Sequence, residues 1–175
     1  MAHRPTLQDF QIRLARRLQA ATTEGQVGAA WLALECSGRF FLVPLAQAGG
    51  IFPWQAVQAV PYTQAWFLGV VPLRGALVGV VDLGGLLGLA PPASPDDSPP
   101  ASLLTFHPSL DVNAALRVGR LLGLRGADAF VASEPAPAGA AAYGGPVWVD
   151  AAGLRWQELS LQALARDAAF LHIAA

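Results

Sequence analysis

The stretch FLGVVPLRGALVGVVDLGGLLGL, residues 67–89, decides the fold of this chain. Apolar residues dominate two runs in and beside it, 66–73 and 76–82, and the pair Arg74-Gly75 separates them. Two short apolar runs around such a pair predict a β-hairpin, because glycine adopts the positive φ of a tight turn at no steric cost. We therefore place a hairpin at the centre of the fold.

Three helical segments are predicted around the strands. A short helical turn at 83–87 follows the hairpin, and Asp82 is placed to cap it. A terminal helix is expected at 160–166. The N-terminal segment predicts an amphipathic helix, which either packs on the chain's own core or docks a partner. Its apolar stripe has helical spacing and consists of Leu7, Phe10, Leu14 and Leu18.

The remaining pattern predicts short strands. The turn pair Ser37-Gly38 separates two apolar runs, 31–36 and 39–43, which read as a second hairpin that ends at Pro44. Many short strands bounded by turn residues are typical of barrels or sandwiches, so we expect a mainly β fold. Further strands are expected at 56–60, 103–107, 115–124 and 147–149.

Two segments look like exposed loops. Residues 91–101, PPASPDDSPPA, hold five prolines and no apolar residue larger than alanine. Such a segment cannot contribute to a core, so we expect it to join two subdomains. A second loop is expected at 133–145. The predicted organisation is an N-terminal helix and linker at 1–25, then one domain at 26–175 with subdomains at about 26–90 and 102–175.

Composition indicates a folded protein without a nucleic-acid or lipid partner. Apolar residues make up 54% of the chain and charged residues 13%, with a formal net charge of −1. This balance supplies a core and shows no basic patch for nucleic acid or anionic membranes. The single Cys36 fits a reducing cytoplasm. The N-terminal segment carries Arg13, Arg16 and Arg17 inside its apolar pattern, so no signal peptide is predicted. The most apolar window, 66–89, is interrupted by Pro72, Arg74 and Asp82, so no membrane span is predicted.

The residue pattern shows no set of groups for catalysis, a cofactor or a metal. No nucleophile elbow, phosphate-binding loop or zinc-protease motif is present. Cys36 reads as a small structural hydrophobe, since no neighbouring cation would lower its pKa. Asp96-Asp97 lacks the further oxygen ligands of a cation site. Isolated histidines predict surface or core-edge positions rather than a catalytic base, and this applies to His3, His107 and His172.

The central stretch resembles the signature of CheW-like domains: a strand enters an Arg-Gly turn, a return strand ends in Asp-Leu, and a short helix closes with Leu-Gly. The similarity extends more weakly to 31–45, 116–124 and 153–173. The closing segment and the leading helix are similar to the PilI type of CheW-like protein, associated with type IV pili and twitching motility. The matching residues are Gly69, Leu73, Arg74, Gly75, Val80, Val81, Asp82, Leu83, Leu87 and Gly88.

The resemblance implies two five-stranded β-barrels with a shared core. It further implies a non-catalytic, cofactor-free adaptor at membrane-associated receptor arrays in the cytoplasm. The implied partners are the regulatory domain of a CheA-type histidine kinase and a methyl-accepting chemoreceptor. An adaptor needs affinity and orientation but no chemistry of its own. The implied partner-contacting residues are Arg74 with Leu73, Gly75 and Leu77 at the hairpin, and Ile51 and Phe52 in the first barrel.

Three departures from the family pattern keep alternatives open. Pro72 stands where the family usually has asparagine, Gly50 lies near its usual acidic residue, and Gly119 replaces an aspartate. An array scaffold without receptor contact is one alternative. A small-ligand-binding or enzymatic β-barrel is another, and it would need polar groups that converge in a pocket. Arg74 is either an interface residue or a solvated turn residue.

Overall fold

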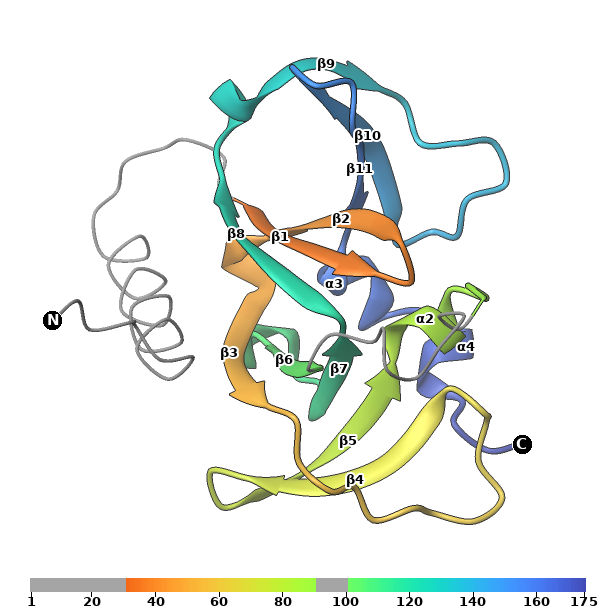
Figure 1. The fold of residues 1–175 in the computed structure, drawn as a ribbon. Helices are drawn as coiled ribbons and strands as arrows, with labels where there is room; N and C mark the ends of the chain where they lie inside the picture. The colour runs from red at the N-terminus through yellow and green to blue at the C-terminus, as the bar shows by residue number, and fades with distance from the viewer. Residues whose placement is uncertain (1–30, 91–100) are drawn as a thin grey trace, which may run out of the picture.

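The computed structural model describes residues 31–90 and 101–175, and its regular structure is mainly β-strand (Figure 1). The strands form two sheets, which Figure 1 shows one above the other. The prediction of a mainly β fold is confirmed. The upper sheet, in the order β8-β1-β2-β11-β10-β9, holds β1 (Trp31–Cys36), β2 (Arg39–Pro44), β8 (Arg120–Arg125), β9 (Phe130–Glu134), β10 (Gly144–Asp150) and β11 (Arg155–Leu159). The lower sheet, in the order β3-β6-β7-β5-β4, holds β3 (Ala48–Pro53), β4 (Phe67–Leu73), β5 (Ala76–Asp82), β6 (Ser102–Phe106) and β7 (Ala114–Val118).

The strand pairings differ from the expected pair of five-stranded barrels. The sheets have six and five strands, and neither strand order returns to its first strand. In the smaller sheet, one isolated bridge between Gln58 and Val70 joins the segment after β3 to the edge strand β4. The additional strand in the larger sheet is β9, which overlaps the loop predicted at 133–145. Four of its five residues are exposed, so it lacks the apolar alternation that would have predicted a strand.

The chain is divided between the sheets differently from the predicted subdomain boundary at 91–101. β5 before this segment and β6 after it lie in the same five-stranded sheet. The first hairpin, β1–β2, instead joins strands from the end of the chain, and β2 pairs in parallel with β11. A local sequence pattern predicts a strand but not its distant partner.

The run 115–124, predicted as one strand, forms two strands in different sheets. β7 ends at Val118 and β8 begins at Arg120. Gly119 lies between them, and a Cβ atom there would stand 2.6 Å from the carbonyl oxygen of Glu35. Only glycine allows so close an approach between backbones. The single-strand prediction is wrong because the chain changes sheets at Gly119.

Both predicted hairpins are present with two-residue turns. Ser37 and Gly38 have φ values of 50° and 75°, and Arg74 and Gly75 have φ values of 49° and 80°. Two consecutive left-handed residues give the turn twist that matches the flanking strands. β2 ends at Pro44, as predicted.

The segment before the second hairpin differs from its prediction. The strand expected at 56–60 is absent except for the bridge at Gln58, whereas the glycine-rich segment before it forms β3. A Cβ at Gly49 would lie 2.5 Å from the carbonyl oxygen of Phe106 on β6. The N–H of Gly50 donates to Oγ1 of Thr105 over 2.7 Å. The glycines therefore permit close strand pairing rather than a loop.

The helices are short. The predicted turn after the hairpin is α2 (Leu83–Leu86), and Oδ2 of Asp82 accepts from the N–H of Gly85 over 2.8 Å, as a cap does. The predicted terminal helix contains α3 (Leu161–Leu164), capped by Ser160, and α4 (Ala168–Leu171) follows it. Short 3-10 turns lie at η1 (Leu45–Gln47), η3 (Pro108–Leu110) and η4 (Ala127–Ala129).

Buried side chains form three clusters. The largest draws on both sheets and on α3 and α4, and includes Leu34, Leu104 and Phe170. A second lies within the five-stranded sheet and includes Val71 and Leu103. The third, within the six-stranded sheet, is rich in aromatic rings. The shared core explains how two sheets built from interleaved segments form one unit.

The N-terminal stripe predicted at residues 7–18 lies outside the described residues. Within residues 31–90 and 101–175, no helix has both the length and the apolar character needed to span a membrane.

Candidate protein-binding surface

The tip of the β4–β5 hairpin holds the predicted contact residue Arg74. Its guanidinium carbon lies 5.0 Å from the centroid of the Phe52 ring, within the range of a cation–π contact. Phe52 comes from β3 and Arg74 from the turn that follows β4, so the contact links the two edge strands of the five-stranded sheet. The structure thus brings together two residues that are far apart in the sequence and that the family resemblance had both implicated.

A second arginine–aromatic contact lies on the same sheet. The guanidinium carbon of Arg117 stands 5.4 Å from the ring centroid of Trp54. Nη1 of Arg117 donates to Oδ1 of Asp82 over 2.9 Å. Asp82 therefore has two roles, because its other oxygen caps α2. The carboxylate fixes the position of Arg117 against Trp54.

We call these residues, Phe52, Trp54, Arg74 and Arg117, the aromatic–arginine surface. Trp54 is 41% exposed. Leu77 is 62% exposed, but strand alternation places it on the opposite face of the β4–β5 hairpin from the cluster that Phe52 packs against. Exposed aromatic rings and arginines are the residue types most enriched at the centres of protein interfaces. The surface therefore has the chemistry of a protein-binding site and offers nothing for group transfer.

The other predicted contact residues occupy different positions. Leu73 is only 5% exposed and packs in the core of the five-stranded sheet. Ile51 packs on the shared core, since it points to the opposite face of β3 from Phe52. Gly75 supplies the turn. Among the predicted set, the structure therefore exposes Arg74 and Leu77, and Phe52 is half-buried against the core of the five-stranded sheet.

Sequence reasoning missed Trp54 and Arg117 as members of this surface. One signal was present: Arg117 is the only charge in the apolar run that forms β7, and a charge on a half-buried strand requires a partner. The sequence could not predict which residue pairs with Arg117. Asp82 becomes the neighbour of Arg117 only through the parallel pairing of β5 with β7.

The remaining reactive groups do not assemble into a chemical site in the described part of the chain. Cys36 is buried, and desolvation raises the pKa of its thiol. A thiol with a raised pKa is a poor nucleophile at neutral pH. Across residues 31–90 and 101–175, no three side chains of His, Cys, Asp or Glu gather in a metal-binding arrangement.

Comparisons with known proteins identify the family of this chain. The family model of the CheW-like domain matches residues 30–168. Protein PilI of Pseudomonas aeruginosa is 28% identical over 133 residues, which cover 75% of this chain and 72% of PilI. A probable chemotaxis protein CheW of Rhizobium etli is 33% identical over 60 residues, 34% of this chain and 39% of that protein. The solved structure of the scaffolding protein TtCheW from Thermoanaerobacter tengcongensis has a TM-score of 0.60 at 12% identity, covering 76% of this chain and 89% of that one.

The fold and its surface define a protein-binding module, and the chain belongs to the CheW-like domain family. It is a CheW-like scaffolding or adaptor protein of chemosensory signalling, a class without catalytic activity of its own.

The double role of Asp82 leads to a testable expectation. Asp82→Ala removes the cap of α2 and the ion pair with Arg117, and we expect it to lower the free energy of unfolding by about 2 kcal/mol, since a cap alone contributes about 1 kcal/mol. Urea denaturation measures the change. Asp82→Asn retains the cap oxygen and should cost less than half as much; equal losses for the two variants would contradict the assigned roles.

Proposed function

We propose that this chain couples chemoreceptors to a CheA-type histidine kinase, in a cytoplasmic array that controls twitching motility by type IV pili. The similarity to PilI over 75% of the chain supports the pilus pathway. The kinase and the receptor are proposed as partners because the chain resembles CheW-like domains. We further propose that the aromatic–arginine surface makes one of these contacts.

The observation that carries the proposed contact is the exposure of Arg74 at a hairpin tip beside a supporting aromatic ring. The Arg74 side chain lies at a hairpin tip and its guanidinium is held over Phe52. Such a contact reduces the conformational entropy that an arginine loses when it binds. Leu77, 62% exposed, adds apolar area on the other face of the same hairpin. An arginine at the centre of an interface is a frequent binding hot spot.

Reversing the charge at the hairpin tip tests the contact. Arg74→Glu is expected to weaken binding to the kinase regulatory domain or to the receptor tip by about 1 to 3 kcal/mol, the scale of an interface arginine. Calorimetry with purified partners measures the affinity, and thermal melting of the same preparation reports on folding. Melting should change little, because the residue is exposed.

A matched control separates a specific contact from a general charge effect. Arg166→Glu makes the same change in net charge at an exposed position near α3 and should leave both affinities unchanged. If Arg74→Glu remains folded and binds both partners with wild-type affinity, Arg74 is a solvated turn residue and the proposed contact is withdrawn. Loss of binding in both variants would indicate general electrostatics instead.

A further inference from the structure

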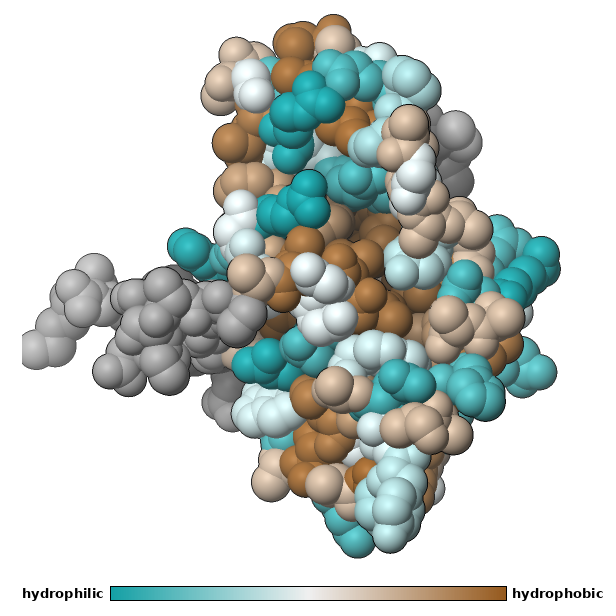
Figure 2. Space-filling view, turned by 90° about the vertical axis from the view of Figure 1, so that its right-hand side faces the viewer, coloured by the Kyte–Doolittle hydropathy of each residue, from teal (hydrophilic) through white to brown (hydrophobic). Residues whose placement is uncertain are grey.

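A second candidate surface lies on the six-stranded sheet. Figure 2 shows the face that carries the 135–143 loop, where apolar side chains gather in a hollow at mid-height between hydrophilic borders. On this sheet a pocket of about 460 Å³ opens beside β2, β10 and β11. Its volume falls within the range of ligand pockets. The pocket is far from Arg74, because the β4–β5 turn lies at the opposite end of the molecule (Figure 1).

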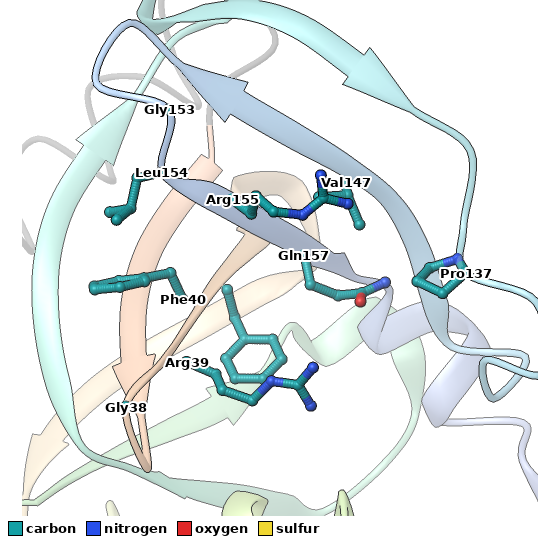
Figure 3. Close-up of a pocket in the computed structure, with 10 residues that line it drawn as sticks. Gly38, Arg39, Phe40, Pro137, Val147, Gly153, Leu154, Arg155 and Gln157 are labelled. Carbon is teal, nitrogen blue, oxygen red and sulfur yellow. The ribbon is translucent and has the colours of Figure 1, made fainter.

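Arginine side chains from two adjacent strands line the pocket. Arg39 of β2 and Arg155 of β11 each precede a residue of the parallel pair Phe40–Trp156, so they lie side by side on the same face. Figure 3 shows their polar ends, with that of Gln157, on the side of the pocket that faces Pro137.

The two arginines differ in their partners. Glu134 on β9 binds Arg155 through two hydrogen bonds of 2.9 Å and 2.6 Å, so this charge is compensated. Arg39 is exposed and forms no ion pair with any residue that the structure describes. The pocket lining contains no aspartate or glutamate. The available charge of the pocket is therefore positive and belongs to Arg39.

Apolar side chains lie on the opposite face of these strands, because Phe40 and Leu154 alternate with Arg39 and Arg155. Figure 3 shows Phe40 and Leu154 together, away from the three polar side chains. Leu154 is 38% exposed, so part of its apolar area remains in water. The face that carries Arg39 thus favours a negatively charged group, and the apolar side chains do not contribute to that contact.

We propose that this pocket binds an exposed acidic segment of a partner protein, with a glutamate or aspartate carboxylate on Arg39. Charge complementarity is the basis of the assignment, because a guanidinium and a carboxylate form charge-assisted hydrogen bonds. This surface goes beyond the hairpin contact proposed above, and either can fail without the other.

A peptide titration of the full chain tests the proposal. The probe is the hexapeptide acetyl-Gly-Ser-Glu-Leu-Ser-Gly-amide, added to the ¹⁵N-labelled protein to about millimolar concentration, where weak binding is measurable. We expect saturable shifts of the amide signals of Gly38 and Gly153 and of the Gln157 side chain. The amide of Gly75, at the hairpin tip, should not shift. A flat titration, or shifts that fail to saturate, would overturn the proposal.

Variants of the protein and of the peptide identify the charge. Arg39→Glu should weaken binding at least tenfold, and Arg39→Gln serves the same purpose if the reversal disturbs folding. A peptide with glutamine in place of glutamate should also bind about tenfold more weakly, the effect of losing one charge-assisted contact of about 1.4 kcal/mol. Arg74→Glu and Arg166→Glu are the matched controls and should bind as the wild type does. Wild-type affinity in a folded Arg39 variant, or for the glutamine peptide, rejects the assignment.

Discussion

Gly69→Ala is expected to lower the free energy of unfolding by about 4 kcal/mol, a combination of backbone strain and a forced shift of packed atoms. Gly69 lies in β4 with φ +132°, a conformation that L side chains rarely adopt. A Cβ there would stand 2.1 Å from the carbonyl oxygen of Gln58. That oxygen accepts the N–H of Val70 over 2.9 Å, so it cannot move without loss of the bridge between the two segments.

Gly75→Ala is the control that isolates the steric contribution. Gly75 also has a positive φ, +80°, but a Cβ at this position would meet no atom within 4 Å. Its replacement should therefore cost only the left-handed backbone preference, about 1 to 2 kcal/mol. Chemical denaturation of both variants gives the comparison. If the two losses are equal, the close approach at Gly69 contributes nothing and the bridge is not a constraint on the fold.

The local parts of the fold were predictable from the sequence because their signals are local. Arg74-Gly75 and Ser37-Gly38 specify turns by themselves, and Asp82 caps the helix that directly follows it. The partners of the strands were not predictable. β2 pairs with β11, more than 100 residues later, through a parallel contact that no turn specifies. Gly119 marks the break between two strands, but the run 115–124 was predicted as one strand. Its close contact with Glu35 exists only after the sheets assemble, so the sequence alone did not show the break.

The candidate site shows the same limit. Arg74 could be singled out because it occupies a turn, and its position at the hairpin tip is as expected. Its contact with Phe52 depends on the meeting of two sheet edges, which periodicity does not describe. Leu73 was included through its neighbours in the sequence, but strand alternation turns it into the core. The pocket at Arg39 has no local signature, because four separate segments line it.

The positions of the two proposed surfaces suit an adaptor. The aromatic–arginine surface belongs to the five-stranded sheet, and the Arg39 pocket belongs to the six-stranded sheet. The shared core joins the sheets through side chains from both. Two partners bound at these surfaces would be held at a fixed relative orientation, which a flexible linker cannot provide. The stability of each sheet is therefore part of the proposed function.

One carboxylate connects three strands of the six-stranded sheet. Oε2 of Glu158 on β11 accepts from Nε1 of Trp31 over 3.2 Å and from Nε1 of Trp148 over 3.0 Å. The rings of the two tryptophans are themselves in contact, with centroids 4.9 Å apart. Trp31 is on β1 and Trp148 on β10, so the carboxylate joins strands that are not neighbours in the sheet. It thereby fixes the aromatic cluster that forms the core of this sheet.

Glu158→Ala is accordingly expected to lower the free energy of unfolding by about 2 to 4 kcal/mol, because it leaves two indole N–H groups without their acceptor in a largely buried cluster. Glu158→Gln keeps an oxygen that can accept from both indoles and loses only the charge, so it should cost about 1 kcal/mol. Urea unfolding followed by tryptophan fluorescence measures both, and the near-ultraviolet circular dichroism of the folded alanine variant should change as the rings lose their fixed orientation. A loss below about 0.5 kcal/mol for Glu158→Ala, the usual range of an unimportant surface substitution, would show that the aromatic packing holds these strands without the carboxylate.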